Sequence, residues 1–522
     1  MVSMVFLKEY SYKSGAALSI GSTFIWKLLS FINSILIAFY FGTQTNSDIY
    51  FYILYIAGLI GIFFTSLNSN VIIPQAIYLK RTGEQKAQSF LNFFLLFYGT
   101  ILLLMLFLGF LFPVDIFALF SKFSIEVLTK ENSLLQLAFL YFAGYILCYF
   151  ILDIMYIHRL FSLNFLFPLN ALIPMLIMLL FHNILGLKTM LIGFIISYLI
   201  QISLGLFLMK SKLNWSFKSF KITFEKRLRH NLITNQILII ANFITSMLPV
   251  YLISSFAGGI ISALSYAKQL TDAPSEILTS KITGVYHIQL NENASSKDYK
   301  ALNTNYIKVN YLILFILVPL ALFTCFFAPD IIDLFFKRGK FNTQSSLNVV
   351  KFLRPLMILL LVNALMPLTT NLIACTRKIK ESFVYLLTQY IITFLALYFF
   401  ITHFGAFAYP YVQIGCGIFS YFVMALFFKK HIPEIYFWQP LKDALLLVFL
   451  NLLALIPAGF ASRLLEGQNC FIRILLCGLI FLFTLTLLYL PVRQIKKLMP
   501  FLLGTHYKTF LNKVPQVLRQ FF

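Results

Sequence analysis

The chain of 522 residues is 60% hydrophobic and only 11% charged, and its mean hydropathy is +0.86. Side chains of this composition cannot all be buried in one water-soluble core, which excludes a soluble globular protein and predicts an all-α polytopic membrane protein. The net charge of +23 does not indicate a nucleic-acid partner, because the basic residues are spread over many short loops and do not form one groove.

Apolar segments long enough to cross a bilayer, separated by charged or Gly/Pro/Asn-rich clusters, predict fourteen transmembrane helices. Their approximate ranges are 15–42, 48–78, 89–113, 133–157, 162–182, 187–209, 231–257, 259–289, 309–328, 347–374, 382–402, 406–428, 441–463 and 470–490. Lys and Arg concentrate in the loops that are cytoplasmic when the N-terminus is inside. Both termini are therefore expected in the cytoplasm.

A decapeptide in the loop after the third predicted helix occurs twice. The segment 111–120 (LFPVDIFALF) returns as 326–335 (FFAPDIIDLF), which places Asp115 and Asp330 at equivalent points 215 residues apart. The copies are six predicted helices apart, and an even number preserves orientation, so the sequence predicts two parallel six-helix lobes plus two C-terminal helices. The predicted parts are an N-terminal lobe at 1–209, a basic cytoplasmic linker on anionic membrane lipids at 210–230, a C-terminal lobe at 231–428, and helices 13 and 14 with a basic cytoplasmic tail at 429–522.

The predicted helix 259–289 carries polar side chains along one face. At 100° per residue they fall within one arc, which contains Ser265, Lys268, Asp272, Ser275, Glu276, Thr279 and Thr283. Asp272 is expected about 20 Å from the external start of the helix, near the bilayer midplane. A charge there is costly in lipid, so the stripe is expected to face a water-filled cavity, with Pro274 kinking the helix beside the charges. The structural alternative is an ion pair between Lys268 and Asp272, buried between helices.

Two further basic residues lie inside predicted helices. Lys27 shares a helical face with Ser19, Thr23, Ser30 and Ser34 near the midplane of the first helix, where an ammonium favours an anion. Arg354 lies about two turns inside the helix 347–374, from where it could also reach outwards.

The chain shows no sign of enzyme chemistry. Its seven histidines form no HxxxH or HExxH pattern, and it has no phosphate-binding loop for nucleotide hydrolysis. We therefore expect no metal and no cofactor. Energy for transport is expected from the membrane potential, a sodium gradient or protons, or from a partner.

Several short stretches match one transporter family. The first stretch comprises Lys27-Leu-Leu-Ser-Phe31, Ile37-Ala38, Phe41-Gly42, Asp48, Tyr50-Phe51 and Pro74. The second comprises Tyr266-Ala267, Leu270, Asp272-Ala-Pro274 and, most specific of all, Leu334-Phe-Phe-Lys-Arg-Gly-Lys-Phe-Asn342. With these motifs the chain resembles the lipid II flippase family (MurJ/MviN) of the multidrug/oligosaccharidyl-lipid/polysaccharide (MOP) exporter superfamily.

The resemblance implies a two-lobed flippase in the bacterial cytoplasmic (inner) membrane. Such a protein moves an undecaprenyl-diphosphate-linked glycan from the inner to the outer leaflet by alternating access, for peptidoglycan biosynthesis or polysaccharide export. By position the resemblance implies substrate-binding roles for Lys27 and Asp272. Together with the polar and charged positions inside the predicted helices, the predicted substrate-binding residues are Lys27, Asn33, Lys268, Asp272, Glu276 and Arg354. The implied gating or structural residues are Asp48, Pro274, Asp330, Arg338 and Gly339.

Departures from the family pattern keep other functions open. Asn33 stands where a second arginine of the first helix is expected, and Lys268-Gln269 replaces an Asp-Arg pair. The carried glycan is therefore either lipid II or a related unit of O-antigen or capsule. The alternatives are a cation-coupled multidrug exporter of the same superfamily, and a non-transporting scaffold that assembles with envelope-synthesis proteins.

Overall fold

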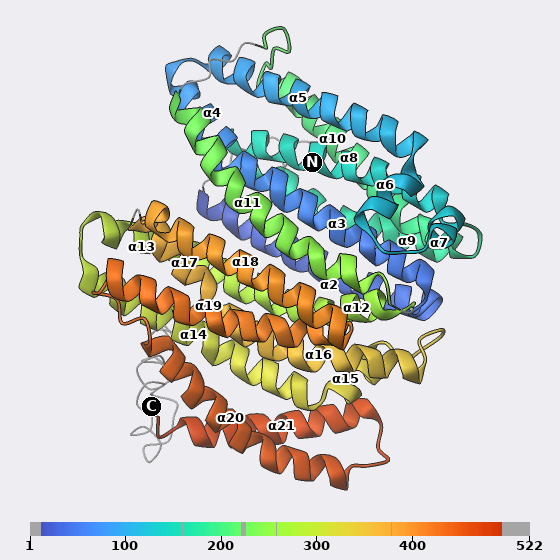
Figure 1. Ribbon diagram of the computed structural model, residues 1–522, viewed down its shortest axis with the longest axis vertical. Coiled ribbons are helices and arrows are strands. Elements are labelled where there is room, and N and C mark those ends of the chain that lie inside the picture. The colour runs from blue at the N-terminus through green and yellow to red at the C-terminus, as the bar shows by residue number, and fades with distance from the viewer. Residues whose placement is uncertain (1–11, 159, 221–225, 257, 377, 493–522) are drawn as a thin grey trace. The chain divides into compact units, whose positions relative to one another are not determined.

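The computed structural model describes residues 12–158, 160–220, 226–256, 258–376 and 378–492, which form helices joined by short turns (Figure 1). No strand occurs within these ranges, so the prediction of an all-α polytopic membrane protein is confirmed. Among the described residues, 13 helices are long and apolar enough to cross a membrane. The predicted count of fourteen is not confirmed.

The segment that separates the two counts is the predicted helix 259–289. It is helical throughout, as α12 (Ile260–Pro274), the π-helix η3 (Ser275–Ser280) and α13 (Lys281–Ser295). It is absent from the helices apolar enough to cross a membrane, because its polar side chains lower its hydropathy. The features that make this segment a functional candidate are those that weaken it as a hydrophobic span.

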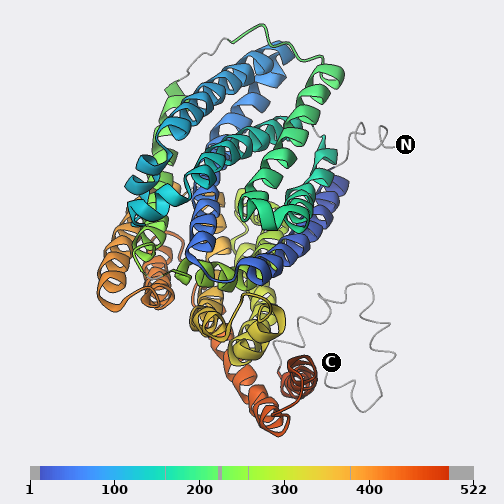
Figure 2. The ribbon, with the colours of Figure 1, turned by 90° about the vertical axis from the view of Figure 1, so that its right-hand side faces the viewer.

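The described chain packs into two compact units, and the first comprises residues 1–266, 338–345 and 386–409. Within unit 1, α10 lies against both α8 and α9, while α8 also packs on α3 and α5, so α8 is central to this bundle (Figure 2). The complete helices of unit 1 are α2 (Tyr12–Phe41), α3 (Thr45–Leu67), η1 (Asn68–Ile72), α4 (Ile73–Thr82), α5 (Glu84–Leu111), α6 (Pro113–Phe120), α7 (Ile125–Lys130), α8 (Asn132–Ile157), η2 (Phe161–Leu166), α9 (Leu169–Leu185), α10 (Lys188–Lys212) and α11 (Lys226–Ile253).

Unit 2 comprises residues 267–337, 346–385 and 410–522. Its helix α14 packs on α13 and α20, and α20 packs on α21. Besides η3 and α13, its complete elements are α14 (Tyr299–Phe326), α15 (Ala328–Phe335), α17 (Met366–Cys375), α20 (Gln439–Leu464) and α21 (Cys470–Tyr489). The division between the units falls within α12, α16 (Thr343–Ala364), α18 (Ile379–Phe404) and α19 (Ala408–His431). This division follows packing and not the sequence repeat, so the predicted lobe boundaries stay a prediction.

The internal repeat is a repeat of structure as well as of sequence. The long helix α5 and the short helix α6 have counterparts in α14 and α15, and each of the four bounds is displaced by 215 residues. The starts of α3 and α12 differ by the same number. In both copies a proline lies in the first turn of the short helix, as expected from its fixed φ angle, and the aspartate is the third residue of that helix.

The contact between α9 and α10 depends on a residue without a side chain. A Cβ atom added to Gly193 of α10 would lie 2.3 Å from the Cα atom of Pro174 in α9. Small residues allow helices to approach this closely in membranes, where packing replaces the hydrophobic effect as the force between helices.

We expect Gly193→Ala to lower the thermal unfolding midpoint of the detergent-purified protein, because the backbone of α9 must move to admit the methyl group. Overpacking of this kind costs about 1–3 kcal/mol. Gly99→Ala in α5 is the matched control, since a Cβ atom there meets nothing within 4 Å. Equal midpoints for the two variants would contradict the close contact.

A histidine at the end of α8 ties together the adjacent ends of α4 and α5. The Nδ1 atom of His158 lies 2.8 Å from Lys80 Nζ, and because an ammonium can only donate, Nδ1 accepts the hydrogen bond. Its Nε2 atom lies 3.8 Å from Glu84 Oε1. Burial and, secondly, the Lys80 charge lower the pKa of His158 from 6.5 to about 4, so the ring is neutral at neutral pH.

The low pKa of His158 predicts acid sensitivity. Below about pH 6.5 the unfolded chain binds a proton that the folded chain does not, so the free energy of unfolding falls as the pH drops from 6.5 towards 4. We expect wild type to lose more thermal stability than His158→Gln between pH 7 and 5. His403→Gln, at an exposed histidine, is the control and should follow wild type. Parallel losses in wild type and His158→Gln would show that this ring is not responsible.

Candidate functional site

Lys27 lies in the middle of α2, in unit 1, where it is half-buried. Its Nζ atom lies 4.7 Å from the ring centroid of Trp26, so the neighbouring indole lies beside the charge. Asn33, which stands in place of an expected arginine, is buried and donates from Nδ2 to the carbonyl of Ala171 in α9 at 2.8 Å. The Asn33 amide therefore joins α2 to α9, while its Oδ1 atom is buried without a hydrogen-bond partner among the described residues.

Four predicted residues occur together on α12 and η3. Lys268 is half-buried, Asp272 and Glu276 are exposed, and Pro274 is the last residue of α12. The π-helix begins directly after this proline, at Ser275. Proline removes a backbone donor, and π-helical turns are frequent at functional sites, so the predicted kink takes the form of a widened turn beside the charges.

The polar stripe does not stay on one face beyond this turn. Asp272 and Glu276 are exposed, whereas Thr279 and Thr283 are buried. One extra residue in a turn rotates the following helix by about 100°, which separates side chains that an ideal α-helix would align. The accessible part of the stripe is therefore its first half, with Lys268, Asp272 and Glu276.

Asp48, one of the predicted gating or structural residues, joins the start of α3 to the start of α12. It lies in the first turn of α3, it is buried, and its carboxylate accepts three hydrogen bonds at the start of α12. The donors are the backbone N–H of Gly259 at 2.6 Å, the backbone N–H of Ser262 at 2.7 Å and the Ser262 hydroxyl at 2.5 Å. The first N–H groups of a helix have no partner within it and carry a partial positive charge, so Asp48 caps α12 from a different helix.

The family-like motif at 334–342 ends against the same region. Lys340 donates its backbone N–H to the carbonyl of Phe39 at 2.9 Å. Gly339 has a φ of +60°, and a Cβ atom there would lie 2.3 Å from the same carbonyl oxygen. Both the left-handed backbone and the close approach require glycine. The motif residue Gly339 therefore has a structural role in bringing this loop against the end of α2.

Hydroxyl groups and rings complete the contact. The Oγ1 atom of Thr43 lies 2.6 Å from Oγ of Ser345, and the Tyr266 hydroxyl donates to the carbonyl of Gly42 at 3.1 Å. The ring of Tyr266 also meets that of Phe341 edge to face. We call the three segments 39–48, 258–266 and 338–345 the triple junction; all three belong to unit 1.

The remaining predicted residues lie elsewhere. Asp330 on α15 forms an ion pair with Arg473 of α21 within unit 2. Arg338 is exposed in the loop of the triple junction, and Arg354 is exposed on α16. The ion pair gives Asp330 a structural role, whereas its counterpart Asp115 is exposed on α6.

One buried polar network was not among the predicted site residues. Asn68 begins the π-helix η1, where it donates to Asp153 Oδ2 at 2.7 Å and accepts from the Tyr98 hydroxyl at 2.7 Å. The network joins η1, α5 and α8. The sequence signal that could have found this network is an aspartate inside an apolar helix, Asp153 of α8.

Comparisons with known proteins place this architecture in a family. Residues 37–477 match the family described as "Lipid II flippase MurJ". No curated protein matches the sequence.

Solved structures agree in fold. A structure of the lipid II flippase MurJ in an inward closed conformation superposes with a TM-score of 0.73 at 18% identity, covering 91% of this chain and 99% of that one. An inward-facing MATE multidrug transporter of the MOP superfamily gives 0.55 at 13% identity, covering 85% and 98%. A MOP superfamily transporter from Pyrococcus furiosus gives 0.51 at 12% identity, covering 84% and 98%.

The sequence match covers most of the chain, and the helical membrane architecture agrees with it. The predicted resemblance is thereby confirmed. The chain is a multi-pass membrane protein, and it belongs to the lipid II flippase MurJ family.

Proposed function

We propose that the protein is a flippase for an undecaprenyl-diphosphate-linked glycan, carried from the inner to the outer leaflet by alternating access. The observation that carries the proposal is the presence of two half-buried lysines within helices, Lys27 in the middle of α2 and Lys268 on the polar stripe of α12. An ammonium in a membrane-spanning helix attracts anions, and the charged oxygens of a diphosphate accept strong hydrogen bonds from ammonium groups. The carboxylates of Asp272 and Glu276 are proposed to weaken the affinity of the lysines for the diphosphate. A moderate affinity is needed so that the substrate can be released.

The widened turn gives this site a means of movement. The π-helix η3 follows Lys268 and Asp272 within two turns, and it contains Glu276. A turn with i→i+5 bonding is easily converted to α-helix by shifting one hydrogen-bond register, which rotates the residues on one side of it. We propose that this rotation presents or withdraws the charges during transport.

The triple junction is proposed as the outer gate. The distribution of Lys and Arg predicts that both termini are cytoplasmic, and with this orientation the loops of the triple junction lie outside. A gate must close by contacts that can be exchanged for water, and hydrogen bonds to backbone groups have this property. Energy is proposed to come from the membrane potential, a sodium gradient or protons.

The multidrug-exporter alternative is disfavoured by the two helices α20 and α21. An exporter of this kind is expected to have twelve helices, the number in the two predicted six-helix lobes. Helices α20 and α21 follow these lobes, and both are long and apolar enough to cross a membrane. They fit the flippase proposal, in which they accommodate the lipid tail. The scaffold alternative differs from the flippase only by loss of transport.

We expect the double variant Lys27→Ala/Lys268→Ala to lower transport of the lipid-linked glycan at least about tenfold, since each lysine is proposed to bind a phosphate and such bonds contribute about 1.5–3 kcal/mol. The assay measures the glycan accessible on the outer surface of cells that depend on this protein. Lys130→Ala/Lys300→Ala removes the same charge from two exposed positions, and it should transport normally. Unchanged transport by the first variant would refute the diphosphate site.

The gate proposal predicts that locking the triple junction stops transport. Thr43→Cys/Ser345→Cys replaces two hydroxyls whose oxygens lie 2.6 Å apart, so oxidation should form a disulfide readily. We expect the oxidised protein to be inactive and reductant to restore activity, because opening requires the segments to separate. The single variants are controls. Full transport by the cross-linked protein would exclude a gating role.

A further inference from the structure

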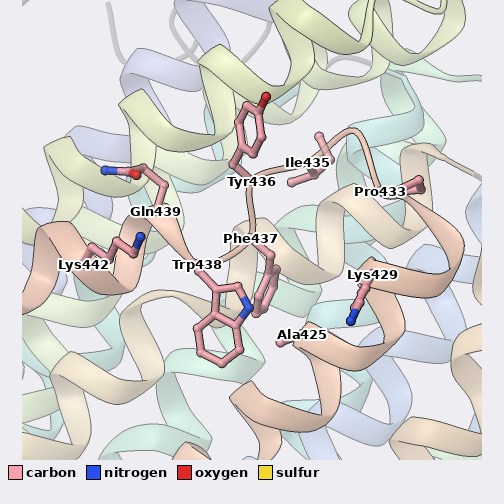
Figure 3. A pocket seen from close by; sticks show the side chains of 9 residues that line it. All are labelled: Ala425, Lys429, Pro433, Ile435, Tyr436, Phe437, Trp438, Gln439 and Lys442. Carbon is pink, nitrogen blue, oxygen red and sulfur yellow. The ribbon is translucent and has the colours of Figure 1, made fainter.

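A pocket of about 320 Å³ lies in unit 2, where α19 ends and α20 begins (Figure 3). Its lining includes two lysines, Lys429 from the last turn of α19 and Lys442 from the first turn of α20. Figure 3 shows these side chains on either side of Trp438. Neither residue belongs to the sites described above.

The connecting loop is held in place by its alternate side chains. Phe437 is only 3% exposed and packs against Tyr421 and Phe428, with ring centroids 4.5 and 4.8 Å away. The Tyr421 hydroxyl donates to the carbonyl of Phe437 at 2.8 Å, and Asn303 of α14 accepts from the backbone N–H of Tyr436 at 2.8 Å. The pocket wall is therefore formed before any ligand arrives.

Because the side chain of Phe437 is buried, the side chains of its two sequence neighbours, Tyr436 and Trp438, point outwards. Trp438 is 42% exposed and Tyr436 is 69% exposed, and both line the pocket. Tyr and Trp are enriched where membrane meets water, because one end of each ring is apolar and the other polar. Their position at the ends of two apolar helices therefore places the pocket at the level of the lipid headgroups.

The charge of the lining has one sign. Lys429 and Lys442 are its only charged members, and Gln439 adds an amide. Glu434 and Asp443, which are close to the lining residues in sequence, do not line the pocket. Asp443 accepts a hydrogen bond from Gln439 Nε2 at 3.0 Å, and Glu434 is exposed. Two compact ammonium groups beside interfacial aromatic rings suit a phosphate ester.

We propose that this pocket binds the phosphate of a lipid headgroup at the membrane surface. The ligand chemistry is a phosphate with an attached apolar chain, supplied either by an anionic phospholipid or by a polyprenyl diphosphate. The two lysines neutralise the phosphate, while Trp438 and Tyr436 contact the boundary between headgroup and chain. The proposal does not depend on the transport activity proposed above.

Lipid binding to the detergent-purified full-length protein, measured by native mass spectrometry, tests the proposal. The added lipids are phosphatidylglycerol in one arm, undecaprenyl diphosphate in a second, and zwitterionic phosphatidylcholine in a third as a reference. Lys429→Gln/Lys442→Gln is compared with Lys430→Gln/Lys300→Gln, which removes two exposed lysines of the same unit from outside the lining. Elution on gel filtration confirms that both variants fold.

We expect the pocket variant to bind at least one of the two anionic lipids about 10- to 30-fold more weakly than wild type, as two lysines near a headgroup imply. The control variant should bind like wild type. A loss in only one arm identifies the source of the phosphate, and a loss in both assigns the site to the phosphate itself. Equal binding by the two variants in both arms, or equal weakening, would overturn the proposal.

Discussion

The buried carboxylate of Asp48 is the contact on which the proposed transport architecture depends. It satisfies N–H groups at the start of α12 that have no partner within that helix, at a point 211 and 214 residues away in sequence. Burying a carboxylate is costly, and three donors offset that cost. Because α12 continues into Lys268, Asp272 and Pro274, the same contact fixes the origin of the helix that carries the charges.

Two π-helices occur in the described part of the chain, and both lie next to polar groups within long helical segments. One begins at Asn68, which bonds Asp153 and Tyr98, and the other follows Pro274 beside Asp272 and Glu276. A widened turn leaves backbone groups poorly paired in a medium without water, so nearby polar side chains are required to compensate. The common feature explains why these helices combine polarity with irregular backbone.

The two copies of the sequence repeat form similar pairs of helices, but the side chains of the two pairs make different contacts. The long and short helices around Asp115 and Asp330 have equivalent first and last residues. The second aspartate forms an ion pair with Arg473, and the loop after the second copy continues into the motif of the triple junction. Backbone geometry was retained in both copies because proline and apolar periodicity specify it locally. Side-chain contacts diverged because they depend on whatever each copy meets.

The sequence by itself determined the class of protein, most of its spans, the repeat and the charged positions on α2 and α12. Each of these depends on composition or on local periodicity, and both can be read directly from the amino-acid sequence. Only the tertiary structure decided which residues form the triple junction, where the polar stripe breaks and how the loop around Phe437 shapes a pocket. The partners of Asp48 and Gly339 are largely backbone groups, which every residue offers, so no pattern of side chains could have identified them.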